Sequence, residues 1–225
     1  MSPISSSATT DHPASAHEPP AVTVAEARTP YAGAHKRLLD VLGALLLLPG
    51  ALVLLALAAV AIRLTSPGPA LYVQRRVGLA GREFPFVKLR TMLDGAERET
   101  GPVWAAPDDP RITPVGRLLR RLRIDELPQL WCVLRGDMSL IGPRPERPYF
   151  VRHLRAELPR YDERLSVRPG ISGWAQVHRP SDRSVADVAA KLRWDLEYVH
   201  HLSLRLDLRI ALATVYVVVT NRFVR

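Results

Sequence analysis

The sequence predicts an α+β fold, rich in helix with a minor β component, in which a small cytoplasmic domain is mounted on an N-terminal membrane helix. Three observations lead to this prediction: an unbroken apolar run over residues 41–62, two β-like stretches between residues 71 and 92, and apolar side chains at helical spacing from residue 115 onward. A chain of 225 residues is long enough for one such domain with appendages.

Residues 1–35 are rich in Ser, Ala, Pro and Thr and show no sustained apolar period, which predicts a disordered tail. No basic segment leads directly into an apolar run at the N-terminus, so we expect no cleaved signal peptide. Three acidic residues and one arginine give this tail a charge of −2. Because the net charge of the whole chain is +9, residues 36–225 carry a net charge of +11. The strongly basic composition of residues 36–225 favours a polyanionic partner: nucleic acid, an anionic lipid surface or a phosphorylated substrate.

Residues 36–63 form the predicted membrane segment, because the apolar run within them is long enough for a membrane helix. A single spanning helix is the simplest interpretation. Pro49 and Gly50 lie in the middle of the run, however, where a proline removes a helical hydrogen bond and produces a kink. Basic residues flank both ends, so the positive-inside rule assigns no direction to a crossing. We therefore favour a re-entrant helix hairpin that bends at Pro49 and leaves both ends in the cytoplasm.

Two strands are predicted next. Residues 66–78 open with turn residues and continue into the β-like stretch Leu-Tyr-Val-Gln, and residues 82–92 form the second strand. Gly78 and Gly81 predict a hairpin turn between the two strands. Residues 94–110 are dense in Gly, Pro and Asp and predict a loop.

Four apolar residues between residues 115 and 122 recur at helical spacing with arginines between them, which predicts a basic amphipathic helix. Such a helix can lie on an anionic bilayer as an interfacial helix, or it can pack its leucines inward as an ordinary surface helix. A second helix is predicted to begin between Asp125 and Pro128 and to run to Gly136, since proline is tolerated in the first turn of a helix.

The remaining chain predicts further short elements. Residues 137–145 form a proline-punctuated loop, residues 149–166 a helix, residues 167–177 a turn followed by an extended piece, and residues 183–202 a helix of mixed charge. Residues 210–220 are apolar but too short to span a bilayer, so they predict a buried or interfacial element. The lone cysteine, Cys132, excludes an intrachain disulfide and fits a reducing compartment.

Adjacent carboxylates in the stretch RRLRIDELPQLW, Asp125 and Glu126, are the first candidate site. Acidic residues are common at helix N-termini because they complement the helix dipole, so a solvated helix start is the simpler interpretation. If a helix begins here, its first N–H groups and the neighbouring arginines also form a site for phosphate. Carboxylates beside a phosphate require a bridging divalent cation, which indicates Mg²⁺. A carboxylate in such a site can also attack phosphorus and form an acyl phosphate.

Other basic residues share this character. Lys88 lies in a predicted strand, Arg144 lies between two prolines that restrict the backbone, and Arg164 follows Tyr161 in an arginine-rich stretch. Each could be a solvated surface base, but together they suit a diphosphate substrate. The sequence has no P-loop, no dinucleotide-binding glycine motif, no zinc-binding Cys/His spacing and no nucleophile elbow. We therefore expect none of the four kinds of site that these motifs form.

The ordered motifs of residues 34–222 resemble the bacterial polyprenyl-phosphate phosphoglycosyl transferases of the monotopic type, also called bacterial sugar transferases. The series that carries the resemblance is KRLLD, SPGPALYVQRRVG, FPFVKLRTM, DDPRITPVGRLLRRLRIDELPQL, GDMSLIGPRPE, RYDERLSVRPGISGWAQV and WDLEYVHHLSLRLDLRI. The resemblance implies transfer of a phospho-sugar from a UDP-sugar to polyprenyl (undecaprenyl) phosphate, with release of UMP, through a covalent aspartyl intermediate. It also implies initiation of glycan or exopolysaccharide assembly.

The resemblance assigns roles to individual residues. Asp125 would be the nucleophile, and Glu126 would help to place Mg²⁺ or the acceptor phosphate, so both are candidate metal ligands. Lys88 and Arg120 would bind phosphate oxygens. The remaining candidates for substrate binding are Arg144 and Asp195, which would hold the nucleotide-sugar, and Arg164.

The resemblance also implies a membrane location. The expected division is a tail over residues 1–35, a re-entrant helix over 36–63 and a catalytic domain over 64–225 on the cytoplasmic face of the inner membrane, in contact with membrane lipid. In the family a Ser-Pro pair breaks the membrane helix, whereas this chain has Leu48 before Pro49. The chain resembles the compact form of the family.

Two alternatives remain open from the sequence. One is a non-catalytic, membrane-anchored basic module that binds anionic lipid or nucleic acid, although the ordered motifs make a nucleic-acid partner unexpected. The other is a conventional glycosyl transferase that releases UDP. The sequence does not name the sugar or the glycan pathway, and it leaves a homo-oligomer open.

Overall fold

The computed structural model describes residues 31–98, 100–106, 109–179 and 184–220. Residues 1–30 of the predicted disordered tail lie outside the described residues. The α-helices are α1 (Ala34–Thr65), α2 (Pro114–Arg121), α3 (Gln129–Arg135), α4 (Pro148–Glu157), α5 (Trp174–His178), α6 (Val185–His200) and α7 (Leu204–Thr220). The strands are β1 (Leu71–Val77), β2 (Glu83–Leu89), β3 (Ser139–Ile141) and β4 (Gly170–Ser172), and three short 3₁₀ helices are η1 (Leu79–Gly81), η2 (Ile124–Glu126) and η3 (Tyr161–Ser166). The predicted helix-rich fold with a minor β component is therefore confirmed.

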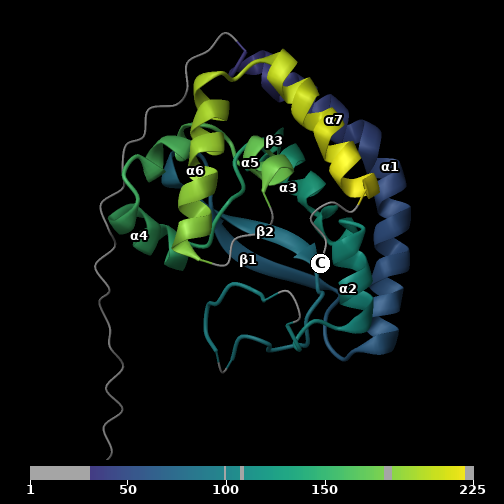
Figure 1. Ribbon diagram of the computed structural model, residues 1–225. Coiled ribbons are helices and arrows are strands. Elements are labelled where there is room, and N and C mark those ends of the chain that lie inside the picture. Colours follow the sequence, from purple (N-terminus) through teal and green to yellow (C-terminus); the bar gives the residue numbers. More distant parts are fainter. Residues whose placement is uncertain (1–30, 99, 107–108, 180–183, 221–225) are drawn as a thin grey trace, which may run out of the picture.

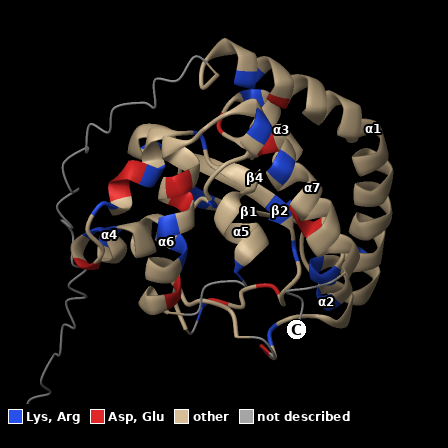
Figure 2. Cartoon of the chain, turned by 45° about the horizontal axis from the view of Figure 1, so that its top comes forward, with Lys and Arg blue, Asp and Glu red and all other residues tan. Residues whose placement is uncertain are grey.

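The long N-terminal helix α1 is continuous through Pro49. It follows a bent path around the domain rather than turning back on itself, so the predicted hairpin of two arms is not confirmed (Figures 1 and 2). A proline interior to a helix removes one hydrogen bond and bends the axis, and strong helix formers on both sides keep the helix intact. Residues 34 and 35, which the sequence assigned to the tail, form the first part of this helix.

One stripe of α1 packs against the domain along its whole length. The buried positions are Lys36, Asp40, Ala44, Ala51, Ala58 and Ile62. Ala44 and Ala51 join a core cluster with residues of β2 and α3, whereas Ala58 and Ile62 join another with Leu89 and Leu119. Mostly small side chains on this stripe allow the helix to approach the domain closely, and the leucines occupy the opposite face.

Both ends of α1 are fastened to the domain by polar contacts. At the N-terminal end, Lys36 Nζ lies 2.7 Å from Asp207 Oδ2 in α7, and Ser139 Oγ donates to Asp40 Oδ1 at 2.9 Å. At the C-terminal end, the Arg90 guanidinium donates to the carbonyl oxygen of Ser66 at 3.0 Å. The two ends of the helix therefore lie on the same body, although the helix is 32 residues long.

The β1–β2 hairpin is antiparallel, with Tyr72 opposite Lys88 and Gln74 opposite Phe86. Gly81, at a φ of +77°, supplies the left-handed conformation that the connecting turn requires, which confirms the hairpin expected from the sequence. The second sheet was missed: β3 and β4 pair in parallel across a short register. β3 falls in the loop predicted for residues 137–145, and strands of three residues are too short to show a periodic pattern.

Three other predicted elements have different boundaries. The helix predicted for residues 149–166 ends at Glu157, because Pro159 cannot continue it and Arg160 takes a φ of +66°. The extended piece predicted up to residue 177 is short, and α5 follows it. The helix predicted to begin between Asp125 and Pro128 is divided into η2 and α3.

Candidate active site

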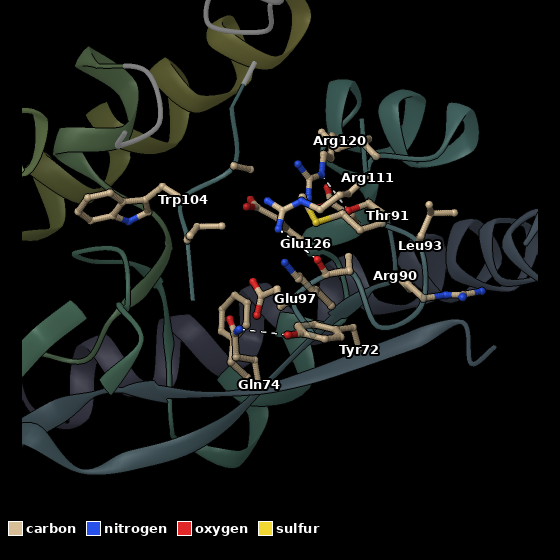
Figure 3. A pocket seen from close by; sticks show the side chains of 18 of the residues that line it. Tyr72, Gln74, Arg90, Thr91, Leu93, Glu97, Trp104, Arg111, Arg120 and Glu126 are labelled. Atoms are coloured by element: carbon tan, nitrogen blue, oxygen red, sulfur yellow. Dashed lines mark hydrogen bonds between the residues drawn. The ribbon is translucent and has the colours of Figure 1, made fainter. Parts of the chain in front are cut away.

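A cavity of about 1580 Å³ opens between the β1–β2 hairpin, the loop after β2, α2 and the start of α4. In Figure 3, Arg120 and Thr91 lie on one side of this cavity and Trp104 lies on the other. The loop that carries Trp104 is held to α4, since the Trp104 ring stacks on Phe150 with ring centroids 4.4 Å apart. Glu97 of the same loop pairs with Arg147 at 2.7 Å. These contacts make the loop after β2 a wall of the cavity.

The hairpin contributes one of its two faces to the cavity. Tyr72, Gln74 and Arg76 alternate along β1, and Phe86 and Lys88 alternate along β2, so side chains two residues apart point to the same face. The Lys88 ammonium lies 5.2 Å from the centre of the Tyr72 ring, directly across the strand pair. Lys88, a candidate for phosphate binding, is therefore presented from a strand pair rather than from a loop.

Asp125 and Glu126 reach the cavity because the chain turns sharply after α2. Arg123 adopts a left-handed conformation with φ of +57°, and η2 follows it at once. A non-glycine residue in this conformation costs about 1–2 kcal/mol, so the surrounding structure must enforce the turn. Asp125 is 8% exposed, and both carboxylates line the cavity. The acidic pair is thus not a solvated helix start.

The two adjacent carboxyl groups have different electrostatic surroundings. Burial and the neighbouring Glu126 raise the pKa of Asp125 to about 6, against the opposing pull of Lys88. Burial also acts to raise the pKa of Glu126, but Arg144 and Arg123 outweigh it and lower that pKa overall. The Arg144 guanidinium lies 2.7 Å from Glu126 Oε1, which explains the difference. Glu126 is held ionised by an arginine, and Asp125 has no such partner among the ion pairs of the described residues.

Three cationic groups predicted to bind phosphate meet around this pair. Arg120 donates from Nε to Thr91 Oγ1 at 2.8 Å, and Lys88 and Arg144 line the same cavity. Burial, together with the nearby charges of Arg76 and Arg120, lowers the pKa of Lys88 to about 8. The site therefore concentrates positive charge around the acidic pair, where it can act on a bound anion.

Arg164 and Asp195, two further candidates for substrate binding, do not line the large cavity. Both are buried, and they pair with each other at 2.7 Å. They line a separate space of about 20 Å³ behind Arg144, which holds about one water molecule. Arg164 also donates to the carbonyl oxygen of Arg144 at 2.8 Å. The geometry favours a role in holding the Arg144 loop over direct contact with a nucleotide-sugar.

Asp195→Asn tests this role. We expect the free energy of unfolding to fall by about 3–5 kcal/mol, because the substitution leaves the buried Arg164 charge without its carboxylate. Chemical denaturation of the purified protein in detergent measures the change. A variant of normal stability that has lost affinity for a nucleotide-sugar would instead show that Asp195 contacts the ligand.

The protonation of Asp125 provides a second test. In metal-free protein, the Asp125 carboxyl should titrate near pH 6, and Glu126→Gln should move this pKa downward because a neighbouring negative charge is removed. Carbon-13 NMR of labelled aspartate measures both values. Glu126→Asp retains the charge and should leave the titration of Asp125 nearly unchanged. An Asp125 pKa near its ordinary 3.8 in the wild-type protein would contradict the buried position.

A magnesium ion would find few protein ligands here. Among the described residues, no group of three or more His, Cys, Asp or Glu side chains is placed to hold a metal. Mg²⁺ commonly binds through one or two carboxylates and completes its coordination with water and substrate phosphates. The Asp125–Glu126 pair fits that pattern, with a bound diphosphate supplying the remaining oxygens.

Sequence reasoning missed several residues of this cavity. Thr91, Arg76 and Gln129 line it, and none of them was singled out. The alternation along β1 could have identified Arg76, since it shares a face with Tyr72 and Gln74. Thr91 is brought to the site by α2, which approaches so closely that a side chain on Gly116 would clash with the Thr91 carbonyl oxygen. No sequence pattern indicates that contact.

Comparison with known proteins gives consistent similarities. Residues 31–221 match the family model described as bacterial sugar transferase. The chain is 48% identical over 184 residues to a UDP-glucose:undecaprenyl-phosphate glucose-1-phosphate transferase of Caulobacter vibrioides, covering 80% of this chain and 68% of that protein. It is 44% identical over 186 residues to a UDP-N-acetylgalactosamine-undecaprenyl-phosphate N-acetylgalactosaminephosphotransferase of Aeromonas hydrophila. That match covers 83% of this chain but only 44% of the longer relative.

Proposed function

Because the chain belongs to the bacterial sugar transferase family, we propose that it transfers a sugar phosphate from a UDP-sugar to undecaprenyl phosphate, releases UMP and so initiates glycan assembly. One observation supports this most directly: Asp125, which forms no ion pair with any described residue, lies beside an arginine-paired Glu126 in a cavity that carries Lys88 and Arg120. The names of its relatives specify different sugars, glucose and N-acetylgalactosamine, at similar identity. The proposal therefore leaves the sugar open.

The proposed reaction has two displacements at one phosphorus atom. Asp125 Oδ attacks the sugar-linked phosphorus, and the bond from that phosphorus to the bridging oxygen breaks, so that UMP leaves. A phosphate oxygen of the polyprenyl phosphate then attacks the same phosphorus, breaks the bond to Asp125 and forms the polyprenyl-diphosphate-sugar. Both substrates are anions that approach an anionic nucleophile. Lys88 and Arg120 reduce this repulsion and stabilise the charge that spreads over the phosphoryl oxygens.

Magnesium belongs to the proposal as the expected cofactor, with Asp125 and Glu126 as its protein ligands. When bound, it would neutralise charge on the diphosphate and polarise the phosphorus. Arg144 pairs with the Glu126 carboxylate at 2.7 Å and would fix its orientation toward such a cation.

We further propose that the protein lies in the cytoplasmic face of the inner membrane without a helix crossing it. Among the described helices, α1 alone is long and apolar enough to cross a bilayer. Its outer face exposes leucines and valines throughout, and α7 exposes Leu208, Leu212 and Val219. Because the domain contacts α1 from its first turn to its last, a perpendicular crossing would carry charged side chains into the hydrocarbon. Figure 2 shows the middle of α1 free of Lys and Arg, whereas α2 carries several.

Identification of the nucleotide product tests the function. Membranes or nanodiscs that contain the protein should release UMP from at least one of a panel of UDP-sugars. Continued turnover should require polyprenyl phosphate, and EDTA should prevent UMP release. Release of UDP would identify a conventional glycosyl transferase. A protein that releases neither nucleotide but binds anionic vesicles or nucleic acid in a salt-dependent manner would be a non-catalytic basic module.

A further inference from the structure

Gln129, the first residue of α3, has a buried side chain with no hydrogen-bond partner. The residue is 1% exposed, and neither its amide nitrogen Nε2 nor its amide oxygen Oε1 is paired. Several other buried side chains within the described residues have one polar atom without a hydrogen-bond partner. Among them, Gln129 alone has both a donor and an acceptor atom unpaired. By contrast, Gln176 donates from Nε2 to the Ile171 carbonyl oxygen at 2.9 Å.

Gln129 is one of the residues that line the same cavity as the acidic pair. Leu127 and Pro128 both have right-handed helical backbone angles, so the chain continues helically from η2 into α3. Side chains three and four residues apart share one face of such a helix. Gln129 therefore follows Glu126 and Asp125 on the face that looks into the cavity.

Leaving both groups unpaired is unfavourable. A buried donor or acceptor without a partner lowers the stability of the folded protein, whereas an apolar side chain of similar shape at this position would avoid that cost. Leu130 and Val133, which follow Gln129 in α3, belong to a buried apolar cluster, so the interior behind the cavity is apolar. An amide in this position is therefore stabilised when a ligand provides both an electropositive group and an acceptor oxygen.

We propose that Gln129 binds the magnesium-bound diphosphate of the nucleotide-sugar, with Oε1 toward the cation and Nε2 donating to a phosphoryl oxygen. This inference rests on the proposed function and adds a residue to its site. Among the described residues, no third Asp, Glu, His or Cys joins Asp125 and Glu126 in a group that could hold a metal, so a neutral amide oxygen adds a ligand without adding charge. A third carboxylate would instead repel the diphosphate and further disfavour ionisation of Asp125.

Gln129→Leu is the main test, using full-length protein in nanodiscs with UDP as the probe. The dissociation constant for UDP in Mg²⁺, from isothermal titration calorimetry, should rise at least tenfold. The affinity for Mn²⁺ in the presence of UDP, from electron paramagnetic resonance, should fall. The melting temperature of ligand-free Gln129→Leu should equal or exceed that of the wild type, because an unsatisfied amide has been removed. Wild-type affinity for UDP would overturn the inference, and so would a loss confined to UDP-sugars, which would place the amide against the sugar.

Two further variants keep the test decisive. Gln129→Glu preserves the shape and one oxygen acceptor but removes the N–H donor. The affinity for UDP should therefore fall while the affinity for Mn²⁺ is retained. Unchanged UDP affinity in this variant would contradict the inference even if Gln129→Leu did not fold. Gln176→Leu is the matched control, and it should lose stability without changing UDP affinity. If the wild type releases UMP but Gln129→Leu binds UDP normally, this inference alone fails, whereas a wild type that releases no UMP contradicts the proposed function.

Discussion

Asp125→Asn should abolish UMP release and should leave no phospho-sugar attached to the protein. The amide has nearly the shape of the carboxylic acid but cannot attack phosphorus, and removing a nucleophile typically lowers turnover by about four orders of magnitude or more. Incubation with a UDP-sugar labelled in the sugar-linked phosphate, followed by acid quench and mass spectrometry, detects the adduct in the wild type and its absence in the variant. Clear UMP release by Asp125→Asn would overturn the assignment of the nucleophile.

The same variant has an internal control for folding. The folded protein raises the pKa of Asp125 from 3.8 to about 6, so between these values the folded state binds more protons than the unfolded state. The contribution of Asp125 to stability therefore decreases as the pH rises through that window and is least favourable above pH 6. Asparagine does not ionise, so the melting temperature of Asp125→Asn at pH 7.5 should be no lower than that of the wild type. A large decrease would indicate that lost activity reflects unfolding.

Glu126→Gln should lower turnover by about 10²–10³-fold and should shift the Mg²⁺ dependence to higher concentrations. Two interactions are lost together: one carboxylate ligand for the cation, and the charge that pairs with Arg144 at 2.7 Å. Loss of a positioned electrostatic group in an active site typically has an effect of this size. Initial rates of UMP release over a range of Mg²⁺ concentrations measure both effects.

Arg144→Gln separates the two contributions of Glu126. It removes the ion pair but leaves the Glu126 carboxylate available to a cation, so its Mg²⁺ dependence should change less than that of Glu126→Gln. Equal shifts in the two variants would mean that the ion pair alone explains the result. A wild-type rate in Glu126→Gln would exclude any role for this carboxylate in the reaction.

The sequence predicts the local parts of this molecule well. The hairpin from residue 71 to residue 89 follows from β-like residues on either side of a glycine-containing turn, and α2 follows from helical spacing. Asp125, Glu126, Lys88 and Arg120 were identified because they occur in recognisable motifs. Each of these features depends on residues that are close in the chain or belong to a known motif.

Features that depend on distant contacts were not predictable. Arg164 and Asp195 are 31 positions apart, and nothing in their surroundings shows that they pair with each other. The burial of Gln129 depends on how α3 packs against the core. Hydropathy likewise treats α1 as uniformly apolar, although its small residues face the domain and its leucines face outward. The continuity of α1 through Pro49 is consistent with that packing, since the domain supports the helix on both sides of the proline.

The packing of α1 has a consequence for how the protein is made. Ala44 and Ala51 complete one core cluster, and Ala58 and Ile62 complete another that includes Leu119 of α2, the helix that carries Arg120. Removing residues 34–65 would therefore open the interior beside the active site, in addition to detaching an anchor. We therefore expect a fragment without residues 34–65 to expose apolar core surface and to have a lower free energy of unfolding than the full chain.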